Sequence, residues 1–396
     1  MVRARAPRLP PLDVRCPIGP RLADGTRREK MKIIGIVAGR HQEQALRIKA
    51  AILKIDAGVE IMVDDGEFKM DEAFKKSDCK INNFNAVERL ASRGAQVVAF
   101  SCGCPHGFMS ELQTETTTRL VDPCDEAGVQ LSAEAYAAKI LATDPAPLPK
   151  PFKVGLVGGL GPAATVDLYD KITRAWPAKN DQEHFKVVIE QNPQTPDRTK
   201  ALLEGGVDPT LALYHSAKRL QEDGCDYIII PCNTAHAFVP FLERHLETPF
   251  INMQQTTLDE IKAKFGDKAR IGLLATSGTV RSGLYSQKAE AMGLPLFAPD
   301  EAHQKLVMSA IYGPEGVKAG FTTGKCRDEL LEAARYLVET YDCNVLILGC
   351  TELPLILNEG DAEVAGKPVF FIDPTSALAR RVCAVARETI NARGVI

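Results

Sequence analysis

Two segments of this sequence end an apolar run with a cysteine, and thiols can act as acids and bases. Cys232 follows the run 227–230, and Cys350 follows the run 345–348. Apolar runs rich in β-branched residues are typical of buried strands, so each thiol is predicted just past the carboxyl end of a strand. Open α/β sheets bind their ligands at these ends. The pair therefore suggests one reaction that needs an acid on one side and a base on the other.

The neighbours of the two cysteines are polar. Asn233 and Thr234 follow Cys232, and Thr351 follows Cys350. A cysteine removes a weakly acidic Cα proton only as the thiolate, so the site must lower the pKa of at least one thiol; these polar groups and the predicted helix N-termini are candidates for that. A single cysteine is more often a buried structural residue. The matched pair with polar neighbours favours catalysis.

The sequence around the cysteines is repeated. Residues 155–169 resemble residues 272–285 with Gly155 matching Gly272, a shift of 117, and the two cysteine segments match at a shift of 118. Strand and helix signals alternate throughout, which is typical of a doubly wound sheet. We therefore predict an α/β fold with two pseudo-symmetric, doubly wound parallel-sheet lobes that face each other across a cleft.

A weaker third copy lies upstream, where Cys102 aligns with Cys232 and His106 with His236. This copy predicts an additional N-terminal α/β lobe of similar type over residues 31–142, without an internal partner. The Pro-rich segment 143–151 is predicted to be a linker, and residues 152–396 the two-lobe domain. Residues 1–30 are rich in Arg and Pro and are expected to be a disordered leader or to precede the true start at Met31.

Composition excludes several classes of function. Of the 396 residues, 45% are apolar and 25% charged, as in soluble globular proteins, and the net charge is −3. That charge argues against nucleic acid or an anionic membrane as partner, and we expect no membrane span. The 11 cysteines form no short disulfide framework, so we expect a reducing, cytoplasmic location.

Two basic residues are candidates for binding an anionic ligand. Arg198 follows a predicted strand and a turn-prone Asn-Pro, and could pair bidentately with a carboxylate. Lys318 stands between glycines that would let the backbone approach a ligand. Both residues could equally be solvated surface groups, with Asp197 simply capping a helix at Arg198.

Two alternatives concern cofactors and metals. Residues 159–164 fit a dinucleotide fingerprint after a strand, so a nicotinamide-dependent dehydrogenase is the rival from another reaction class. The equivalent segment 272–279 lacks that pattern, and the paired cysteines would go unused. Four residues could form a soft-metal cluster, but Cys-x-Cys spacing is weak evidence and we expect no metal. These residues are Cys102, Cys104, His106 and Cys124.

Six motifs over residues 152–390 give this sequence a specific resemblance to the aspartate/glutamate racemase family, in its aspartate-racemase branch. The order and spacing of the motifs also follow the family. They are Gly-Gly-Leu-Gly-Pro-Ala-Ala-Thr (158–165), Asn-Pro-Gln-Thr-Pro-Asp-Arg-Thr (192–199), Pro-Cys-Asn-Thr-Ala-His (231–236), Leu-Leu-Ala-Thr-Ser-Gly-Thr (273–279), Val-Lys (317–318) and Gly-Cys-Thr-Glu-Leu-Pro (349–354).

The resemblance implies cofactor-independent racemisation of an acidic amino acid, without pyridoxal phosphate. One thiolate removes the Cα proton while the other thiol returns a proton to the opposite face, so Cys232 and Cys350 are the implied catalytic pair. Residues matching Asn233, Thr234 and Thr351 hold the amino-acid backbone, and those matching Arg198 and Lys318 take the side-chain carboxylate. Three further residues are expected to bind substrate: Gly161, Thr276 and Glu352.

Several points stay open at this stage. Glutamate racemases carry His where this chain has Glu352, which favours aspartate, but the two substrates differ by one methylene. Hydantoin racemase or maleate isomerase-like chemistry, or a non-catalytic sensor of acidic amino acids, are the alternatives. The resemblance implies a homodimer. The 31–142 lobe departs from the family and is expected to be non-catalytic, with a role in regulation, ligand sensing or oligomer contacts.

Overall fold

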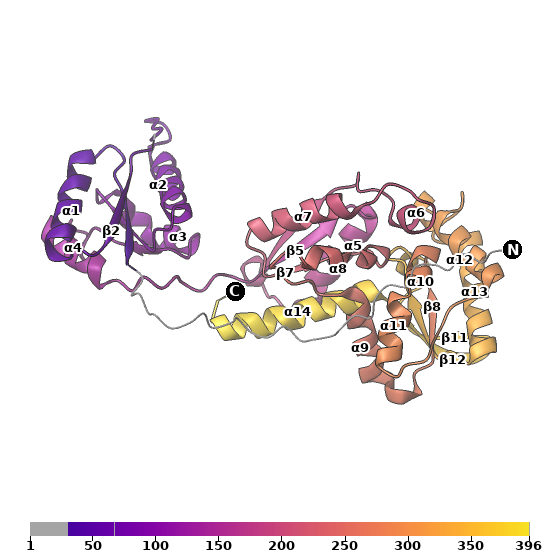
Figure 1. Ribbon diagram of the computed structural model, residues 1–396. Coiled ribbons are helices and arrows are strands. Elements are labelled where there is room, and N and C mark those ends of the chain that lie inside the picture. Colours follow the sequence, from indigo (N-terminus) through magenta and orange to yellow (C-terminus); the bar gives the residue numbers. More distant parts are fainter. Residues whose placement is uncertain (1–30, 67, 396) are drawn as a thin grey trace. The chain divides into compact units, whose positions relative to one another are not determined.

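The computed structural model describes residues 31–66 and 68–395, which divide into two compact units between Leu148 and Pro149 (Figure 1). Unit 1 ends at Leu148 and unit 2 begins at Pro149. Residues 143–152, which include the predicted linker, contain no helix or strand. The expected leader over residues 1–30 lies outside the described residues, and the domain boundaries above stay predictions.

Unit 1 is a four-stranded parallel sheet in the order β2-β1-β3-β4. Alternate residues of a strand point to opposite faces, and here both faces are buried: Ile34 and Ile36 belong to one hydrophobic cluster and Val37 to another. Helices α1 and α4 cover the first face, and α2 and α3 the second. The elements are β1 (Ile33–Val37), α1 (Gln42–Ile55), β2 (Glu60–Asp64), α2 (Lys75–Ser92), β3 (Val97–Phe100), η1 (Cys104–Phe108), α3 (Met109–Thr114), β4 (Arg119–Val121) and α4 (Ala133–Ala142).

Unit 2 holds two lobes, and the first is built on a parallel sheet in the order β6-β5-β7. Helices α5 and α14 cover one face of the sheet, and α7 and α8 cover the other. The elements are β5 (Lys153–Gly158), α5 (Pro162–Ala175), η2 (Asp181–Glu183), β6 (Lys186–Gln191), α6 (Arg198–Leu203), α7 (Thr210–Glu222), β7 (Tyr227–Ile229), η3 (Thr234–Ala237), α8 (Val239–Glu243) and, from the end of the chain, α14 (Pro374–Arg393).

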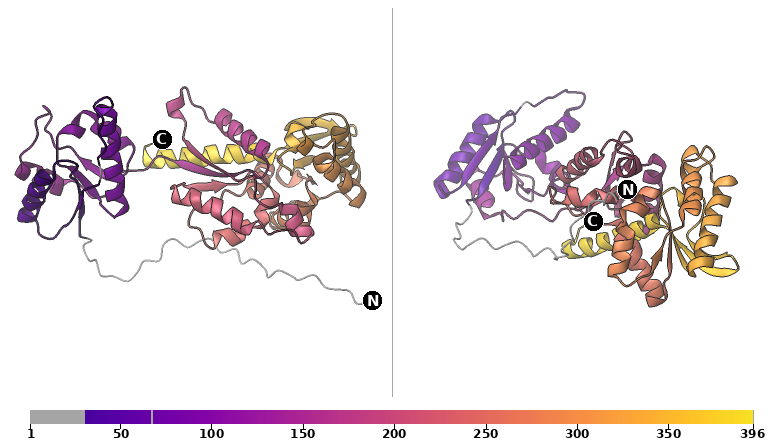
Figure 2. Two further views of the ribbon diagram at one scale, coloured as in Figure 1. Left: turned by 90° about the horizontal axis from the view of Figure 1, so that it is seen from above. Right: turned by 45° about the vertical axis from the view of Figure 1, so that its right-hand side comes forward.

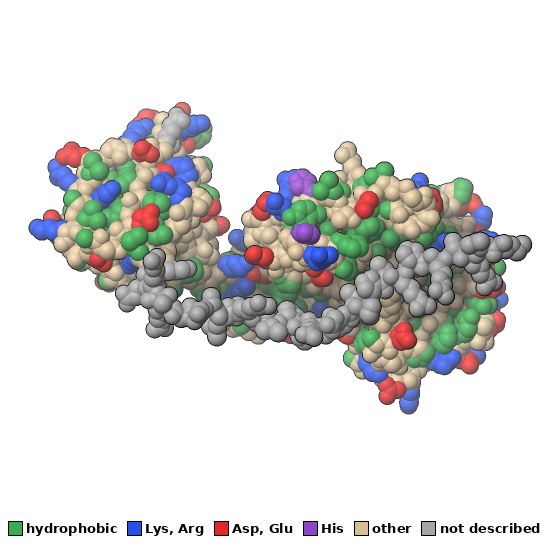
Figure 3. Space-filling view, viewed as in Figure 1, with side chains coloured by type: hydrophobic (Ala, Val, Ile, Leu, Met, Phe, Trp, Pro, Cys, Tyr) green, Lys and Arg blue, Asp and Glu red, His purple; other side chains and the backbone are tan. Residues whose placement is uncertain are grey.

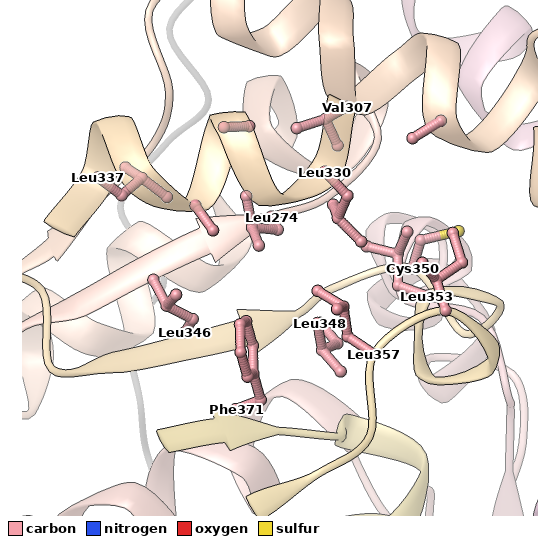
Figure 4. Close-up of a cluster of buried hydrophobic side chains, with 14 of the residues drawn as sticks. Leu274, Val307, Leu330, Leu337, Leu346, Leu348, Cys350, Leu353, Leu357 and Phe371 are labelled. Carbon is pink, nitrogen blue, oxygen red and sulfur yellow. The ribbon is translucent and has the colours of Figure 1, made fainter. Parts of the chain in front are cut away.

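The second lobe has five strands in the order β11-β12-β10-β8-β9. Helices α12 and α13 bury one face of this sheet, where Leu274, Leu346 and Phe371 pack (Figure 4), and α9 and α11 bury the other. The elements are α9 (Met253–Phe265), η4 (Gly266–Lys268), β8 (Ile271–Leu274), α10 (Ser277–Ser282), α11 (Leu284–Ala291), β9 (Leu296–Phe297), α12 (Glu301–Tyr312), η5 (Val317–Ala319), α13 (Lys325–Tyr341), β10 (Val345–Leu348), η6 (Leu353–Leu355), β11 (Gly360–Val364) and β12 (Lys367–Ile372).

The predicted α/β class with two doubly wound lobes is confirmed in unit 2, with one strand that departs from the parallel pattern. β11 runs antiparallel to β12. The two strands are joined by Ala365 and Gly366, which both have positive φ, 54° and 71°. Two left-handed residues make the tight turn that fits a two-residue hairpin, so β11 folds back as an edge strand.

Two contacts hold the lobes of unit 2 together. Helix α14, the long yellow helix in Figures 1 and 2, packs on α5 of the first lobe and α9 of the second. Nearer the strand ends, α10 of the second lobe packs on α6 and η3 of the first. Gly278 makes this second contact possible, because an added Cβ would lie only 2.9 Å from Thr199 Oγ1 and 3.1 Å from Thr234 Cγ2.

The surface carries both signs of charge. On the face shown in Figure 3, acidic and basic side chains lie interspersed on each unit. Among the described residues, no helix combines the length and the apolar character that a membrane crossing would require.

Replacing Gly278 by Ala should destabilise the protein. The added methyl group must displace α6 or η3, and overpacking of this kind costs about 1–3 kcal/mol. Urea unfolding of the full chain measures the loss as a lower midpoint. Gly107→Ala is the matched control, because its Cβ meets nothing within 4 Å and should leave the midpoint nearly unchanged. Equal midpoints for both variants would contradict the packing described.

Candidate active site

A cavity of about 310 Å³ lies at the carboxyl ends of β5, β7, β8 and β10. Both lobes contribute to it. Leu160, Arg198, Thr199, Cys232, Asn233 and Thr234 come from the first lobe, and Thr276, Tyr312, Lys318, Gly349, Cys350, Thr351 and Glu352 from the second. Polar and ionisable side chains from both lobes converge on the cavity, which is typical of a small-molecule site.

The structure brings together nearly all the residues that the sequence indicated. Nine of the ten predicted site residues line the cavity. The tenth, Gly161, lies directly behind Glu352: with φ of 140°, it would place a Cβ only 2.5 Å from Glu352 Oε1. Gly161 therefore leaves room for the Glu352 carboxylate and does not line the cavity itself.

Cys350 is buried at the end of the cluster drawn in Figure 4, and its partner is Glu352. The Cys350 thiol donates a hydrogen bond to Glu352 Oε2 at 3.0 Å. Burial raises the pKa of Cys350 well above its usual range; the Glu352 carboxylate raises it further, and Lys318 opposes this in part. Cys350 is therefore a protonated thiol at neutral pH.

Lys318 does not stand free in the cavity. Its ammonium group forms an ion pair with Glu352 Oε1 and lies 5.6 Å from the centre of the Tyr312 ring. Burial lowers the pKa of Lys318, but the Cys350 sulfur, once it ionises at high pH, and the Glu352 carboxylate outweigh burial and hold the pKa above its usual range. The cation expected to receive a substrate carboxylate is thus already balanced by a carboxylate of the protein.

Cys232 is held in place through its backbone. His236 is fully buried, and burial lowers its pKa to about 4, so the ring is neutral. His236 Nε2 accepts the backbone N–H of Met253 at 3.2 Å, which leaves the proton on Nδ1, 2.9 Å from the Cys232 carbonyl oxygen. The imidazole therefore fixes the loop that carries the thiol.

The guanidinium of Arg198 lies against the Cys232 side chain. Its terminal nitrogens donate to the carbonyls of Leu160 and Pro196 at 2.8 and 3.1 Å, which set its position. Arg198 Nε is buried and has no hydrogen-bond partner among the described residues. This arrangement puts a fixed positive charge beside one thiol and leaves one donor for a ligand.

Asn233 supplies the second unpaired donor of the cavity, after Arg198. Its Oδ1 accepts the hydroxyl of the fully buried Tyr285 at 2.8 Å. Since Oδ1 is bound there, the amide NH₂ group is turned the other way, and Nδ2 is buried without a partner in the described part of the chain. Buried donors are rarely left unpaired, so Arg198 Nε and Asn233 Nδ2 indicate an acceptor supplied by a ligand.

Three threonine hydroxyls join the lobes beneath the cavity. Thr234 Oγ1 lies 3.1 Å from Thr276 Oγ1 and 2.9 Å from Thr279 Oγ1, and the last two are 3.2 Å apart. Thr234 belongs to η3 of the first lobe, whereas the other two begin α10 of the second, where Thr276 is the N-cap. The hydroxyls therefore join the segment after β7 to the start of α10, which follows β8.

The sequence did not indicate four of the lining residues: Leu160, Thr199, Tyr312 and Gly349. Thr199 and Gly349 adjoin predicted residues, so their positions were within reach of the motifs. Tyr312 ends α12, five residues before the Val317-Lys318 motif, but it belongs to none of the motifs and no local signal identifies it. Burial raises its pKa to about 12, so it is a neutral phenol.

The glycines that resembled a dinucleotide fingerprint have a packing role here. Gly159 has φ of 86°, and a Cβ on it would lie 2.5–2.6 Å from the backbone of Asn192 and Pro193. The loop after β6 therefore passes directly over this residue. Close approach of protein backbone accounts for Gly159 without a nucleotide.

Comparison with known proteins identifies the family of this chain. Residues 157–382 match the family model Asp/Glu/Hydantoin racemase. The chain belongs to that family. The match covers both lobes of unit 2 and no part of unit 1.

Individual relatives support the assignment. The chain is 24% identical to the broad specificity amino-acid racemase RacX of Bacillus subtilis over 243 residues, 57% of this chain and 95% of RacX. It is 31% identical to the glutamate racemase of Aquifex pyrophilus over 151 residues, 37% of this chain, and spans only 55% of that enzyme.

A solved structure from Yersinia pestis shows the same fold. A Yersinia pestis protein assigned to the Asp/Glu racemases is 24% identical, with a TM-score of 0.50, over 60% of this chain and 99% of that one. The aspartate racemase of Picrophilus torridus is 30% identical, with a TM-score of 0.47, over 61% of this chain and 94% of that one.

Replacing Glu352 by Gln should lower the pKa of Cys350. The substitution removes the negative charge that disfavours the thiolate, and it leaves the Lys318 cation to act on the sulfur unopposed. The measurement is ultraviolet absorbance of the thiolate against pH, taken as the difference between chains with and without Cys350. Glu359→Gln serves as control, since Glu359 pairs with Arg380. An unchanged or higher Cys350 pKa in Glu352→Gln would contradict the assigned contact.

Proposed function

We propose that this protein racemises aspartate, and glutamate more weakly, through a two-base proton transfer between Cys232 and Cys350. The family and its named relatives support racemase activity, which is an isomerase reaction. The observation that carries the two-base proposal is that two free thiols from corresponding strand ends of two lobes line one cavity. A carbon atom bound between them could be reached from opposite faces.

The surroundings of the two thiols suggest which acts first. Cys350 keeps its proton, because burial and Glu352 raise its pKa. Cys232 lies against the Arg198 guanidinium, which would offset negative charge on the sulfur. In one direction the Cys232 thiolate takes the Cα proton and becomes a thiol, while the Cys350 thiol gives its proton to the opposite face and becomes a thiolate. The other enantiomer follows the reverse transfer, so atoms and charges balance and no cofactor is needed.

Fixed donors would stabilise the carbanion-like transition state. Preorganised donors aimed at developing charge are commonly the largest contribution to catalysis. Arg198 Nε and Asn233 Nδ2 are such donors, buried at the cavity and unpaired among the described residues. We assign to them the carboxylate groups of the substrate, with Thr234 and Thr351 beside them. Because Lys318 is balanced by Glu352, Arg198 supplies the net positive charge for an acidic amino acid.

A reducing, cytoplasmic location fits this chemistry. The ten cysteines in the described residues are all free, among them both proposed catalytic thiols. A disulfide at either position would remove the acid or the base.

Replacing either proposed catalytic cysteine by Ser should abolish racemisation but not every proton transfer. A hydroxyl is a far weaker base, so we expect racemisation to fall by at least roughly 10²–10⁴-fold. In heavy water Cys350→Ser should still exchange the Cα proton on the face of Cys232. Cys232→Ser should label the opposite enantiomer, and more slowly, because its remaining thiol, Cys350, holds its proton at neutral pH. Proton NMR and chiral chromatography of aspartate measure both effects.

The control for this experiment is Cys225→Ser, a buried cysteine outside the cavity, which should keep racemase activity. If a variant with both Cys232→Ser and Cys350→Ser still racemised aspartate, the two-thiol scheme would be ruled out. If the wild-type chain binds aspartate without isotope exchange, it is a sensor, and if only hydantoins or maleate react, the substrate proposal is wrong.

Tyr285→Phe should weaken substrate binding, although Tyr285 acts only through Asn233 and does not contact the substrate itself. Without the hydroxyl, the Asn233 amide can rotate and its NH₂ group no longer points consistently into the cavity. One lost hydrogen bond to a charged ligand corresponds to about 1.5–3 kcal/mol, so KM should rise by at least tenfold while the deuterium label still appears at Cα. Tyr214→Phe, whose ring packs on His245, is the matched control. An unchanged KM would show that Tyr285 does not orient the amide.

A further inference from the structure

Unit 1 contains a cluster of three metal-binding side chains outside the racemase region. His106 lies on η1, and Asp122 and Cys124 follow β4, so the cluster stands at the carboxyl edge of the parallel sheet. One ligand atom from each residue lies within 4.8 Å of the other two. His106 Nδ1 and Asp122 Oδ2 are 2.8 Å apart. Three different donors, nitrogen, oxygen and sulfur, thus converge on one point.

The separations are close to those of a metal site. Zinc bonds of about 2.0–2.3 Å in a tetrahedral arrangement place ligand atoms roughly 3.3–3.8 Å apart. The pair at 2.8 Å must open slightly, and the longest separation must close by about 1 Å at most to reach that geometry. His106 and Asp122 are partly exposed, with side-chain exposures of 37% and 26%, so small rotations suffice.

The loop that carries Asp122 and Cys124 is already fixed. The Cys124 N–H donates to Asp122 Oδ1 at 2.9 Å, and Cys124 pairs with Gln130 in an antiparallel bridge. Lys139 of α4 donates to the carbonyls of Asp122 and Cys124 at 2.9 and 3.1 Å. The two ligands are therefore held at their spacing by the protein and need little ordering when a metal binds.

Gly103 keeps the Cys124 sulfur clear of another side chain. A Cβ at Gly103 would lie 3.2 Å from Cys124 Sγ, which is tighter than an ordinary contact. Backbone thus approaches this ligand atom where a larger residue would crowd it. The buried Cys124 closes one side, while the partly exposed His106 and Asp122 leave the other side open to water.

We propose that His106, Asp122 and Cys124 bind one divalent transition-metal ion, with Zn²⁺ favoured by this set of donors. Three protein ligands with an open side would leave a fourth position for water or a small ligand. The site differs from the four-residue cluster considered from the sequence. Cys102 and Cys104 line a separate hollow of about 450 Å³ together with Cys79, and Asp122 takes their place as a ligand.

The test is titration of the full chain with Co²⁺, which replaces Zn²⁺ and is visible by absorption. We expect saturation at one Co²⁺ per chain. The bound ion should show a thiolate-to-cobalt charge-transfer band and the visible bands of four-coordinate Co²⁺, and both should disappear when Zn²⁺ displaces the cobalt. Cys124→Ser should remove the thiolate band. His106→Ala and Asp122→Asn should each weaken Co²⁺ binding by roughly 100-fold or more. This is a larger loss than expected for a residue that only hydrogen-bonds to a metal ligand, which costs roughly 10–100-fold.

Cys102→Ser and Cys350→Ser are the matched controls, and both should keep the bands. A thiolate band that persists in Cys124→Ser, or a wild-type chain that gives no band at all, overturns the proposal. His106→Ala covers the case in which Cys124→Ser does not fold, because His106 is partly exposed: unchanged cobalt affinity in His106→Ala also overturns it. Circular dichroism reports whether each variant is folded.

Discussion

The proposed two-thiol chemistry depends on the separation of two strand ends that belong to different lobes. Two thiols can serve one carbon atom only if the lobes cannot slide past each other. The buried hydroxyls of Thr234, Thr276 and Thr279 cross the lobe boundary just below the cavity, and Gly278 lets the helices carrying them approach closely. Helix α14 closes the far side by packing on both lobes. The cavity therefore exists only because the two lobes pack against each other.

Within this pseudo-symmetric frame the two thiols have different electrostatic surroundings. Cys232 has the Arg198 guanidinium at its side, whereas Cys350 has the Glu352 carboxylate, itself paired with Lys318. A racemase that interconverts mirror images does not need mirror-image surroundings, since it needs only one acid and one base in each direction. The duplicated fold supplies the positions of the thiols, and features that are not shared between the lobes supply their charged neighbours.

The third cysteine segment shows how a similar strand end can diverge. His236 and His106 both stand four residues after a cysteine. His236 fixes the carbonyl of Cys232, but His106 turns to Asp122 instead. Cys102 has no second lobe within unit 1 to face it, and its surroundings are those of a hollow lined mainly by apolar residues. The same local pattern therefore supports different chemistry, because each strand end is completed by residues from elsewhere.

The sequence by itself determined the fold class of the two lobes and most of the cavity residues. Strand runs, strand-end cysteines and an internal repeat are local signals, and parallel sheets gather the carboxyl ends of their strands at one edge. Only the tertiary structure decided the pairing of Lys318 with Glu352, the entry of Tyr312 into the cavity, the Tyr285 contact that orients Asn233, and the meeting of His106 with Asp122. These contacts join residues on separate elements, so they follow from how helices pack on the sheets, which no local pattern records.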